Sequence, residues 1–212
     1  HSGLYEFFVM PFGLTNAPAT FQGVMNQIFA PLLRKGVLVF MDDILIYSSS
    51  LSKHLELLEQ VFLIIQQNQF LLKLSKCSFA QTEIEYLGHC ISGKGVATEP
   101  SKIEAVKLWP TPSNLKDLRG FLGLTGYYRK FIRHYSMISR PLTQLLKKGV
   151  QFLWTPTAQE SFSLLKQALV EAPVLAIPDF GKQFVLETDA SDIGLGAVHM
   201  QNEHLVAYLS KA

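Results

Sequence analysis

Two short apolar runs lie close together in the first quarter of the chain and leave few folds open to it. Residues 37–40 (VLVF) and 44–47 (ILIY) are separated only by Met41, Asp42 and Asp43. Two β-prone runs with so short a connection are expected to pair as a tight antiparallel hairpin. Their apolar side chains need a core, whereas the two acids need water or cations. The sequence therefore predicts a sheet-containing fold with two carboxylates at an exposed hairpin tip.

The segments around this hairpin alternate between strand and helix patterns. Residues 5–10 are apolar and β-prone, and a helix is expected from an N-cap at Asn16 to near Gly36. A second helix is expected over residues 52–67, and one strand over residues 84–91. The apolar stripe of the second helix is predicted to be Leu55, Leu58, Phe62 and Ile65. The order β-α-β-β-α-β predicts an α+β fold.

The pattern changes at Glu99-Pro100, where helices follow one another and strands return only near the end. Helices are predicted for residues 101–108, for a segment capped by Ser113, and for residues 140–147 and 157–170. A short strand is predicted for residues 150–154. Residues 183–187, 194–200 and 204–209 alternate with a period of two. These three strands are expected to begin a second domain.

The positive charge of the chain is concentrated in its middle. Residues 101–148 hold ten Lys and Arg against Glu104 and Asp117, whereas the net charge of the whole chain is only +2. A basic segment between acidic flanks is what a polyanion-binding element would have. The alternative is a helical face whose charges are simply solvated.

Several function classes are disfavoured by the composition. No apolar run reaches the ~18 to 20 residues that span a bilayer, so no membrane association is expected. Cys77 and Cys90 form neither a disulfide framework nor a metal-ligand pattern, which favours a reducing compartment. The chain starts at His1 without the features of a signal peptide. We therefore expect an intracellular, internal piece of a longer protein.

The adjacent acids of the hairpin have a specific chemical implication. Neighbouring carboxylates repel each other unless cations neutralise them. Mg²⁺ binds through one or two carboxylates together with substrate phosphates, and paired metal ions about 4 Å apart serve phosphoryl transfer. The alternative is a solvated Asp-Asp turn. The apolar runs on both sides of Asp42 and Asp43 favour the metal site, because they leave only the acids exposed.

Five motifs in this order resemble Ty3/gypsy-type long-terminal-repeat retrotransposon reverse transcriptases. They are VMPFGLTNAPATFQ at 9–22, FMDD at 40–43, YLGH at 86–89, LRGFLGLTGYYR at 118–129 and TDAS at 188–191. The resemblance implies a partial right-hand polymerase palm with its primer-grip hairpin over residues 1–96 and a helical thumb over 97–148. It also implies a connection over 149–172 and the first strands of a ribonuclease H-like domain over 173–212.

The resemblance assigns roles to residues of the palm. Asp42 and Asp43 would be catalytic and would hold Mg²⁺ or Mn²⁺, with Met41 under the primer end or the incoming nucleotide. The other nucleotide-binding positions are Phe12, Gly13 and Lys76. Phe12 would exclude a 2′-hydroxyl, and the alternative for it is simple core packing. Gly13 would allow the backbone to approach the sugar closely, and Lys76 competes with Lys73 as a proton donor to pyrophosphate.

Nucleic-acid contacts are implied for the primer grip and the thumb. The primer-grip residues are Tyr86, Leu87, Gly88 and His89. The thumb residues are Lys116, Arg119, Gly120, Gly123, Tyr127, Arg129, Lys130 and Arg133. Small residues between cations let a helix lie against a sugar-phosphate backbone. The alternative for the glycines is close helix-helix packing.

The second catalytic centre is implied only in part. Asp189 would be a metal-binding carboxylate of the ribonuclease, and the other carboxylates of that centre do not occur within this chain. The polymerase centre also needs an aspartate from an upstream strand, but no residue before Glu6 is acidic. The chain by itself is therefore expected to be inactive.

The resemblance also names partners and a location. The parent would bind an RNA/DNA template-primer and dNTPs, and its protein partners would be a second copy or the other polyprotein segments. Its location would be a cytoplasmic virus-like particle or the nucleus. The alternative function is that of a decayed or domesticated remnant that binds nucleic acid or protein without catalysis.

Overall fold

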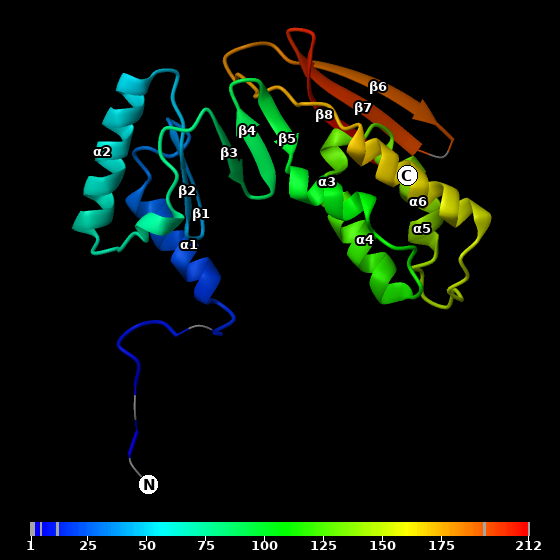
Figure 1. Cartoon of the computed structure of the whole chain (residues 1–212), viewed down its shortest axis with the longest axis horizontal. Coiled ribbons are helices and arrows are strands. Elements are labelled where there is room, and N and C mark those ends of the chain that lie inside the picture. Colours follow the sequence, from blue (N-terminus) through cyan, green and yellow to red (C-terminus); the bar gives the residue numbers. More distant parts are fainter. Residues whose placement is uncertain (1–2, 5, 12, 193, 212) are drawn as a thin grey trace. The chain divides into compact units, whose positions relative to one another are not determined.

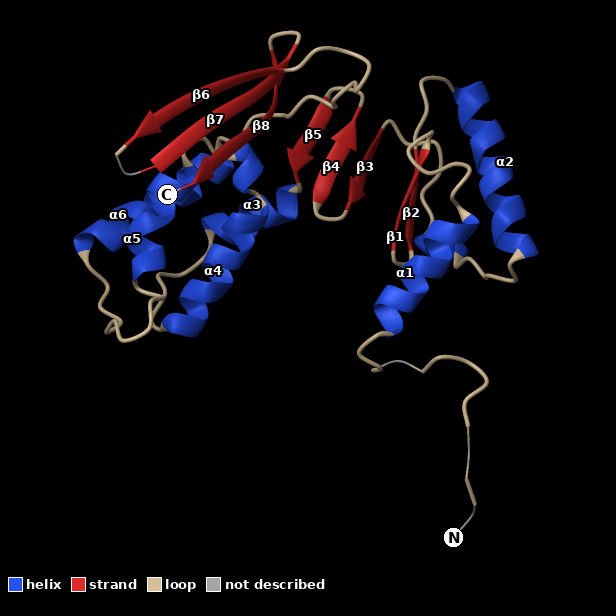
Figure 2. Ribbon diagram, turned by 180° about the vertical axis from the view of Figure 1, so that it is seen from behind, coloured by secondary structure: helices blue, strands red, loops and turns tan. Residues whose placement is uncertain are grey.

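The structure is a computed structural model that describes residues 3–4, 6–11, 13–192 and 194–211 (Figure 1). Its internal contacts divide the chain into two compact units, one ending at Gln81 and the other starting at Thr82. The expected α+β composition is confirmed, because helices alternate with three separate antiparallel sheets (Figure 2). The domain boundaries expected at residues 96, 148 and 172 stay predictions.

The first unit packs two helices against a two-stranded hairpin. Its elements are α1 (Ala17–Ile28), β1 (Val37–Phe40), β2 (Asp43–Ile46), α2 (Leu51–Gln67) and the 3₁₀ turn η1 (Leu74–Lys76). The buried core of the unit consists of Met25, Phe29, Val37, Val61 and Ile65. This core contains residues from both helices and from β1, so it fixes the position of the hairpin relative to the helices.

Three expectations for the first unit are wrong. The described residues between 6 and 10 form no strand, because no described strand offers them backbone partners. The side chains of Phe7 and Phe8 are exposed. α1 ends at Ile28, and the chain reaches Gly36 through turns. The stripe expected on α2 is wrong in part. Ile65 is buried as expected and Leu58 is partly buried, whereas Leu55 and Phe62 are largely exposed, and Leu57 and Val61 are buried instead.

The second unit contains two three-stranded sheets and a group of helices. The first sheet is formed by β3 (Glu83–Tyr86), β4 (His89–Ser92) and β5 (Gly95–Thr98). The helical elements are α3 (Pro100–Lys107), α4 (Leu115–Tyr127), the 3₁₀ turn η2 (Arg129–Phe131), α5 (Tyr135–Gln144) and α6 (Pro156–Val170). The second sheet is formed by β6 (Val185–Ser191), β7 (Gly194–Gln201) and β8 (His204–Lys211).

One continuous apolar core connects the helices of the second unit. Leu118 and Phe121 of α4, Leu142 of α5 and Leu165 of α6 are fully buried in it. β8 packs on α5 and η2, and the Ser136 N–H donates to the Ser210 Oγ over 2.9 Å. The helices and the second sheet therefore form one body with a shared core (Figure 2).

The two sheets of the second unit are linked through the segment that follows α6. Val96 of β5 and Leu175 exchange two backbone hydrogen bonds of 2.8 Å. A Cβ atom on the neighbouring Gly95 would lie 2.2 Å from the Leu175 carbonyl oxygen, so only glycine fits there.

Four expectations for the second unit need correction. Residues 84–91 form two strands with a turn at Leu87 and Gly88, and residues 150–154 are not a strand. The helix expected at 140–147 begins at Tyr135 and ends at Gln144. The side chain that caps α4 belongs to Asn114, which accepts from the Lys116 and Asp117 N–H groups, and Ser113 instead donates to Asp117.

None of the helices in the described part of the chain is long and apolar enough to cross a membrane.

Candidate functional site

The acidic hairpin has the tightest form of connection. Phe40 pairs with Asp43, so only Met41 and Asp42 form the turn, and Met41 has a left-handed φ of 52°. A two-residue turn with a positive φ matches the twist of paired strands. Asp42 and Asp43 are both exposed, and Leu45 below them is buried. Asp43 is thus the first residue of β2, one position earlier than the sequence pattern indicated.

A side chain of α1 holds this turn. The Met41 N–H donates to Gln22 Oε1 over 2.6 Å, and Gln22 Nε2 donates to the Val39 carbonyl over 3.2 Å. The same Nε2 also lies 2.9 Å from Asn26 Oδ1, which fixes the orientation of the amide on the helix. Gln22 therefore ties both the last part of β1 and the turn to α1, and it limits the positions that the two carboxylates can take.

The carboxylate pair fits a divalent metal only in part. Two exposed carboxylates supply hard oxygen donors of the kind that Mg²⁺ prefers. Within the residues that the structure describes, no group of three or more Cys, His, Asp or Glu side chains could hold a metal ion. Asp42 and Asp43 can thus contribute two ligands, and further ligands would come from phosphates, water or other protein groups.

The expected nucleotide-binding residues lie in several parts of the first unit. Gly13 is exposed, has a φ of +95°, and has open space where a Cβ atom would be. Lys76 is the last residue of η1, and its competitor Lys73 directly precedes that turn. Both side chains are exposed. Phe12 lies outside the described residues. Exposure is compatible with the expected roles of Gly13 and Lys76, which stay predictions.

Helix α4, which is expected to belong to the thumb, keeps one face open. Lys116, Gly120, Gly123 and Tyr127 are exposed, whereas Leu118 and Phe121 are buried on the other face. A Cβ atom on Gly123 would meet nothing within 4 Å, so this glycine does not serve helix packing. A Cβ atom on Gly120 would touch the Trp109 ring at 3.4 Å. Packing therefore explains Gly120 in part and Gly123 not at all.

The cations of this segment are not equivalent. Arg119, Arg129 and Arg133 are exposed. Lys130 is partly buried, its Nζ lies 5.2 Å from the centre of the Phe131 ring, and burial lowers the pKa of its ammonium group. Lys130 therefore contributes to the fold as well as to the charge of the surface, which makes it a weaker candidate for a phosphate contact than the arginines.

The expected primer-grip residues lie together at one hairpin. Tyr86 ends β3, Leu87 and Gly88 form the turn, and His89 begins β4. All four are partly buried. The His89 ring stacks on the Tyr127 ring of α4 with centroids 5.4 Å apart, and burial together with the nearby Lys130 lowers the pKa of His89. The structure thus brings the residues expected in the primer grip next to those expected on the thumb.

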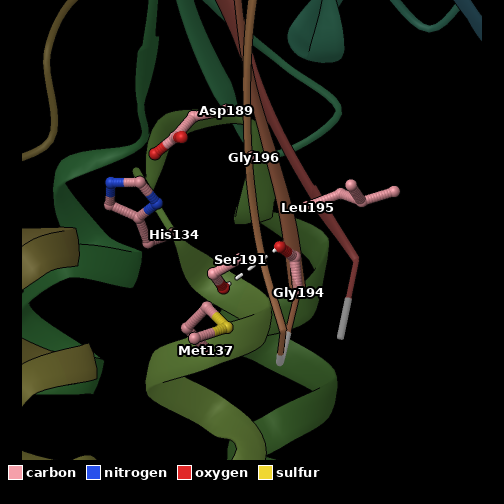
Figure 3. A pocket seen from close by; sticks show the side chains of 7 residues that line it. All are labelled: His134, Met137, Asp189, Ser191, Gly194, Leu195 and Gly196. Carbon is pink, nitrogen blue, oxygen red and sulfur yellow. Dashed lines mark hydrogen bonds between the residues drawn. The ribbon is translucent and has the colours of Figure 1, made fainter.

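Asp189 lines a pocket between the second sheet and the start of α5. The pocket has a volume of about 250 Å³ and is also lined by His134, Met137, Ser191 and Gly196. Figure 3 shows the Asp189 carboxylate and the His134 ring at the same pocket. Asp189 is exposed, so its carboxylate is accessible to a cation.

Two parts of the chain match known protein families. Residues 1–91 match the family described as reverse transcriptase (RNA-dependent DNA polymerase). Residues 154–212 match the RNase H-like domain found in reverse transcriptase. The chain therefore carries a reverse transcriptase segment and a ribonuclease H-like segment. The first segment contains the acidic hairpin, and the second contains Asp189.

Similar proteins are Pol polyproteins of transposons. The chain is 46% identical over 211 residues to the retrovirus-related Pol polyprotein from transposon 297 of Drosophila melanogaster. The alignment covers 99% of this chain and 20% of the relative. It is 42% identical over 199 residues to the transposon Tf2-3 polyprotein of Schizosaccharomyces pombe, which covers 94% of the chain and 15% of that relative. The chain thus spans about a fifth or less of the length of these relatives.

Solved structures of foamy viral enzymes share the fold. The protease-reverse transcriptase dRH in complex with ds DNA has a TM-score of 0.87 and 26% identity, over 95% of this chain and 36% of that chain. The protease-reverse transcriptase in complex with RNA/DNA hybrid has a TM-score of 0.85 and 26% identity, over 95% and 28%. The expected fold of a partial polymerase followed by ribonuclease H-like strands is therefore confirmed.

Sequence reasoning did not identify the role of Gln22 in the reverse transcriptase segment. We expect Gln22→Ala to leave the Met41 N–H unpaired, which should cost about 1 to 2 kcal/mol locally and speed amide exchange at Met41 roughly tenfold. Amide exchange followed by NMR is the measurement. Gln27→Ala is the matched control, because Gln27 is exposed on the same helix. Equal exchange rates at Met41 in both variants would contradict the role of Gln22.

Proposed function

We propose that this chain forms the second half of the palm, the thumb, a connection and the first ribonuclease H-like strands of a Ty3/gypsy-type retrotransposon reverse transcriptase. The boundaries proposed for these parts are residues 1–96, 97–148, 149–172 and 173–212. The parent protein would extend a primer with dNTPs on an RNA or DNA template and would cleave the RNA of a hybrid. The observation that carries the proposal is the pair of exposed carboxylates on an apolar hairpin inside the reverse transcriptase segment.

Asp42 and Asp43 would hold Mg²⁺ or Mn²⁺ in the polymerase centre, and Asp189 would do so in the ribonuclease centre. A bound divalent ion would stabilise the oxygens that attack and leave in phosphoryl transfer. Gln22 would keep the carboxylates at a fixed position relative to α1, through its bonds to Met41 and Val39. Met41, Phe12, Gly13 and Lys76 would contact the primer end or the nucleotide, as the family resemblance implies.

Binding of nucleic acid is the activity that we propose for the chain itself. Its support is the open face of α4, where Lys116, Gly123 and Tyr127 are exposed beside exposed arginines. The similarity to enzymes solved with ds DNA and RNA/DNA hybrid adds to this support. A non-catalytic binding module, such as a decayed or domesticated remnant, is the second candidate. The basic face of α4 also supports this second candidate, because binding of nucleic acid by that face requires no further carboxylates.

The remaining partners and the location are also proposals. A second copy of the chain or the other segments of the Pol polyprotein would be the protein partners. The location would be intracellular, in a cytoplasmic virus-like particle or in the nucleus. Both proposals rest on the resemblance to retrotransposon proteins.

We expect the chain to bind duplex DNA without sequence preference and with a steep dependence on salt. If three to five phosphates are contacted, affinity should fall about 40- to 500-fold between 50 and 200 mM salt, at a slope near 0.9 per contact. Lys116→Ala should flatten the slope of log K against log salt by about 0.9 and weaken all sequences alike. Fluorescence anisotropy with labelled duplexes measures both effects.

Lys182→Ala is the control for this binding experiment. Lys182 is exposed and pairs with Asp179 over 3.4 Å, outside the basic segment. Its removal should leave the salt slope unchanged. Lys130→Ala is a less clear test than Lys116→Ala, because Lys130 is partly buried against Phe131. Binding that is absent at low salt, or that does not respond to salt, would show that the basic face is only solvated.

A further inference from the structure

The turn between β3 and β4 is tied to the end of the thumb helix by two hydrogen bonds. The Tyr127 hydroxyl donates to the Leu87 carbonyl over 2.7 Å, and the Tyr128 hydroxyl donates to the Gly88 carbonyl over 2.6 Å. Two consecutive tyrosines thus satisfy two consecutive carbonyls of a turn that lies 40 residues earlier in the chain. The Gly88 carbonyl also accepts from the Glu99 N–H over 3.3 Å, so the Tyr128 hydroxyl provides the shorter of its two hydrogen bonds.

The backbone of this turn needs support from outside. Leu87 and Gly88 have positive φ values of 50° and 74°, and such a turn normally prefers Asn, Asp or Gly at its first position. Leucine in a left-handed conformation is strained, and strain of this kind persists only where surrounding contacts hold it. A Cβ atom on Gly88 would lie 2.9 Å from the Tyr128 hydroxyl oxygen, so the tyrosine and the glycine fit each other closely.

Aromatic contacts surround the two hydrogen bonds. The His89 ring stacks on Tyr127 at 5.4 Å and meets the edge of Tyr128 at 5.5 Å, and Phe131 lies 5.7 Å from it. Tyr128 and Phe131 are each 1% exposed, and burial is the main cause that raises the pKa of Tyr128 to about 12. The turn therefore packs into the core of the thumb, and its sheet belongs to the same compact unit.

The two tyrosines differ in what they present to solvent. Tyr128 is buried, so its hydroxyl acts only on the turn. Tyr127 is 54% exposed and lies on the open face of α4 with Lys116 and Gly123. Its ring is thus in contact with the turn and at the same time part of the proposed nucleic-acid surface.

We propose that Tyr127 and Tyr128 are positioning residues that make the Leu87–Gly88 turn a rigid part of the thumb. The turn and the open face of α4 then present one continuous surface to the primer strand, and the turn follows any movement of the thumb. The nucleic-acid side of this inference rests on the proposed function, whereas the mechanical coupling of turn and helix rests on the contacts alone.

Hydrogen exchange of the 212-residue chain tests the coupling. Tyr127→Phe and Tyr128→Phe remove only a hydroxyl and keep the ring, so the fold should persist. We expect amide exchange across residues 86–89 to become on the order of tenfold faster in Tyr128→Phe, because the partly buried Gly88 carbonyl then keeps only its longer bond from the Glu99 N–H. Tyr127→Phe should have a smaller effect in the same direction, since water can replace its more exposed hydroxyl.

Tyr135→Phe is the matched control. The Tyr135 hydroxyl lies 3.2 Å from Thr125 Oγ1, so its removal affects the same helix but not the turn. Exchange across residues 86–89 should stay at the wild-type rate in this variant. An exchange rate in Tyr128→Phe equal to that of the wild type would overturn the coupling, because the Tyr128 hydroxyl would then have no role in holding the turn. An equal increase in Tyr135→Phe would also overturn it, because the effect would then be general destabilisation.

Photo-crosslinking tests the positioning of the primer. The probe is a primer–template DNA duplex with 4-thiothymidine at the primer 3′ end, and the crosslinked peptide is identified by mass spectrometry. We expect Tyr128→Phe to keep its duplex affinity within about twofold while crosslinking to residues 86–89 falls several-fold. Unchanged crosslinking in Tyr128→Phe overturns the positioning role. A wild-type chain that binds no duplex would instead contradict the proposed function, and the exchange result would still decide the coupling.

Discussion

No template-dependent primer extension is expected from the 212-residue chain with either Mg²⁺ or Mn²⁺. Phosphoryl transfer by two metal ions needs several carboxylates that hold both ions at a fixed separation. Asp42 and Asp43 supply two exposed carboxylates, and the described residues assemble no third ligand beside them. The sequence has no acidic residue before Glu6 that could serve as the aspartate of an upstream strand. A labelled primer–template, four dNTPs and a denaturing gel measure the extension.

A longer reverse transcriptase assayed under the same conditions is the positive control. Extension by the chain itself that disappears in Asp42→Asn would contradict the expectation, because it would show a complete centre within these residues. Addition of a separate polypeptide with the fingers and an upstream aspartate is a different experiment. Extension restored in that mixture, and lost again with Asp42→Asn, would support the metal-binding role of Asp42.

The acidic hairpin could be predicted because its signal is local. Two apolar runs separated by three residues are expected to pair as a hairpin, and the structure differs in shifting the second strand by one residue, to Asp43–Ile46 instead of 44–47. The hairpin at residues 83–92 could not be predicted from pattern alone. Its turn consists of Leu87 and Gly88, and a leucine there gives no turn signal and continues the apolar run. The tyrosines that hold this turn come from 40 residues later.

The buried side of α2 illustrates a second limit. Leucine, isoleucine and phenylalanine occur on more than one side of this helix, so periodicity allowed two different stripes. The packing of unit one selects Leu57, Val61 and Ile65, and leaves Leu55 and Phe62 largely exposed. The role of Gln22 has the same origin, because its partners Val39 and Met41 lie 17 and 19 residues away. Contacts of this kind follow from the tertiary structure and have no local sequence signal.

Phe121→Ala should have the largest effect on the stability of the second unit. The Phe121 ring is fully buried and lies between Phe162, at 4.5 Å, and Trp109, at 6.0 Å. Truncation of a buried phenylalanine removes apolar contacts and leaves a cavity, which costs about 3 to 5 kcal/mol. The midpoint of thermal unfolding should therefore fall by roughly 10 °C or more.

Tryptophan fluorescence measures this effect in the correct unit, because Trp109 and Trp154 are the two tryptophans of the chain and both follow Thr82. Phe180→Ala is the matched control, since Phe180 is 86% exposed in the same unit. Its loss should change the free energy of unfolding by less than about 0.5 kcal/mol. A loss of similar size in both variants would mean that α4 does not anchor the core. The open face of α4 and the turn held by Tyr127 and Tyr128 would then lack the rigid support that both proposals assume.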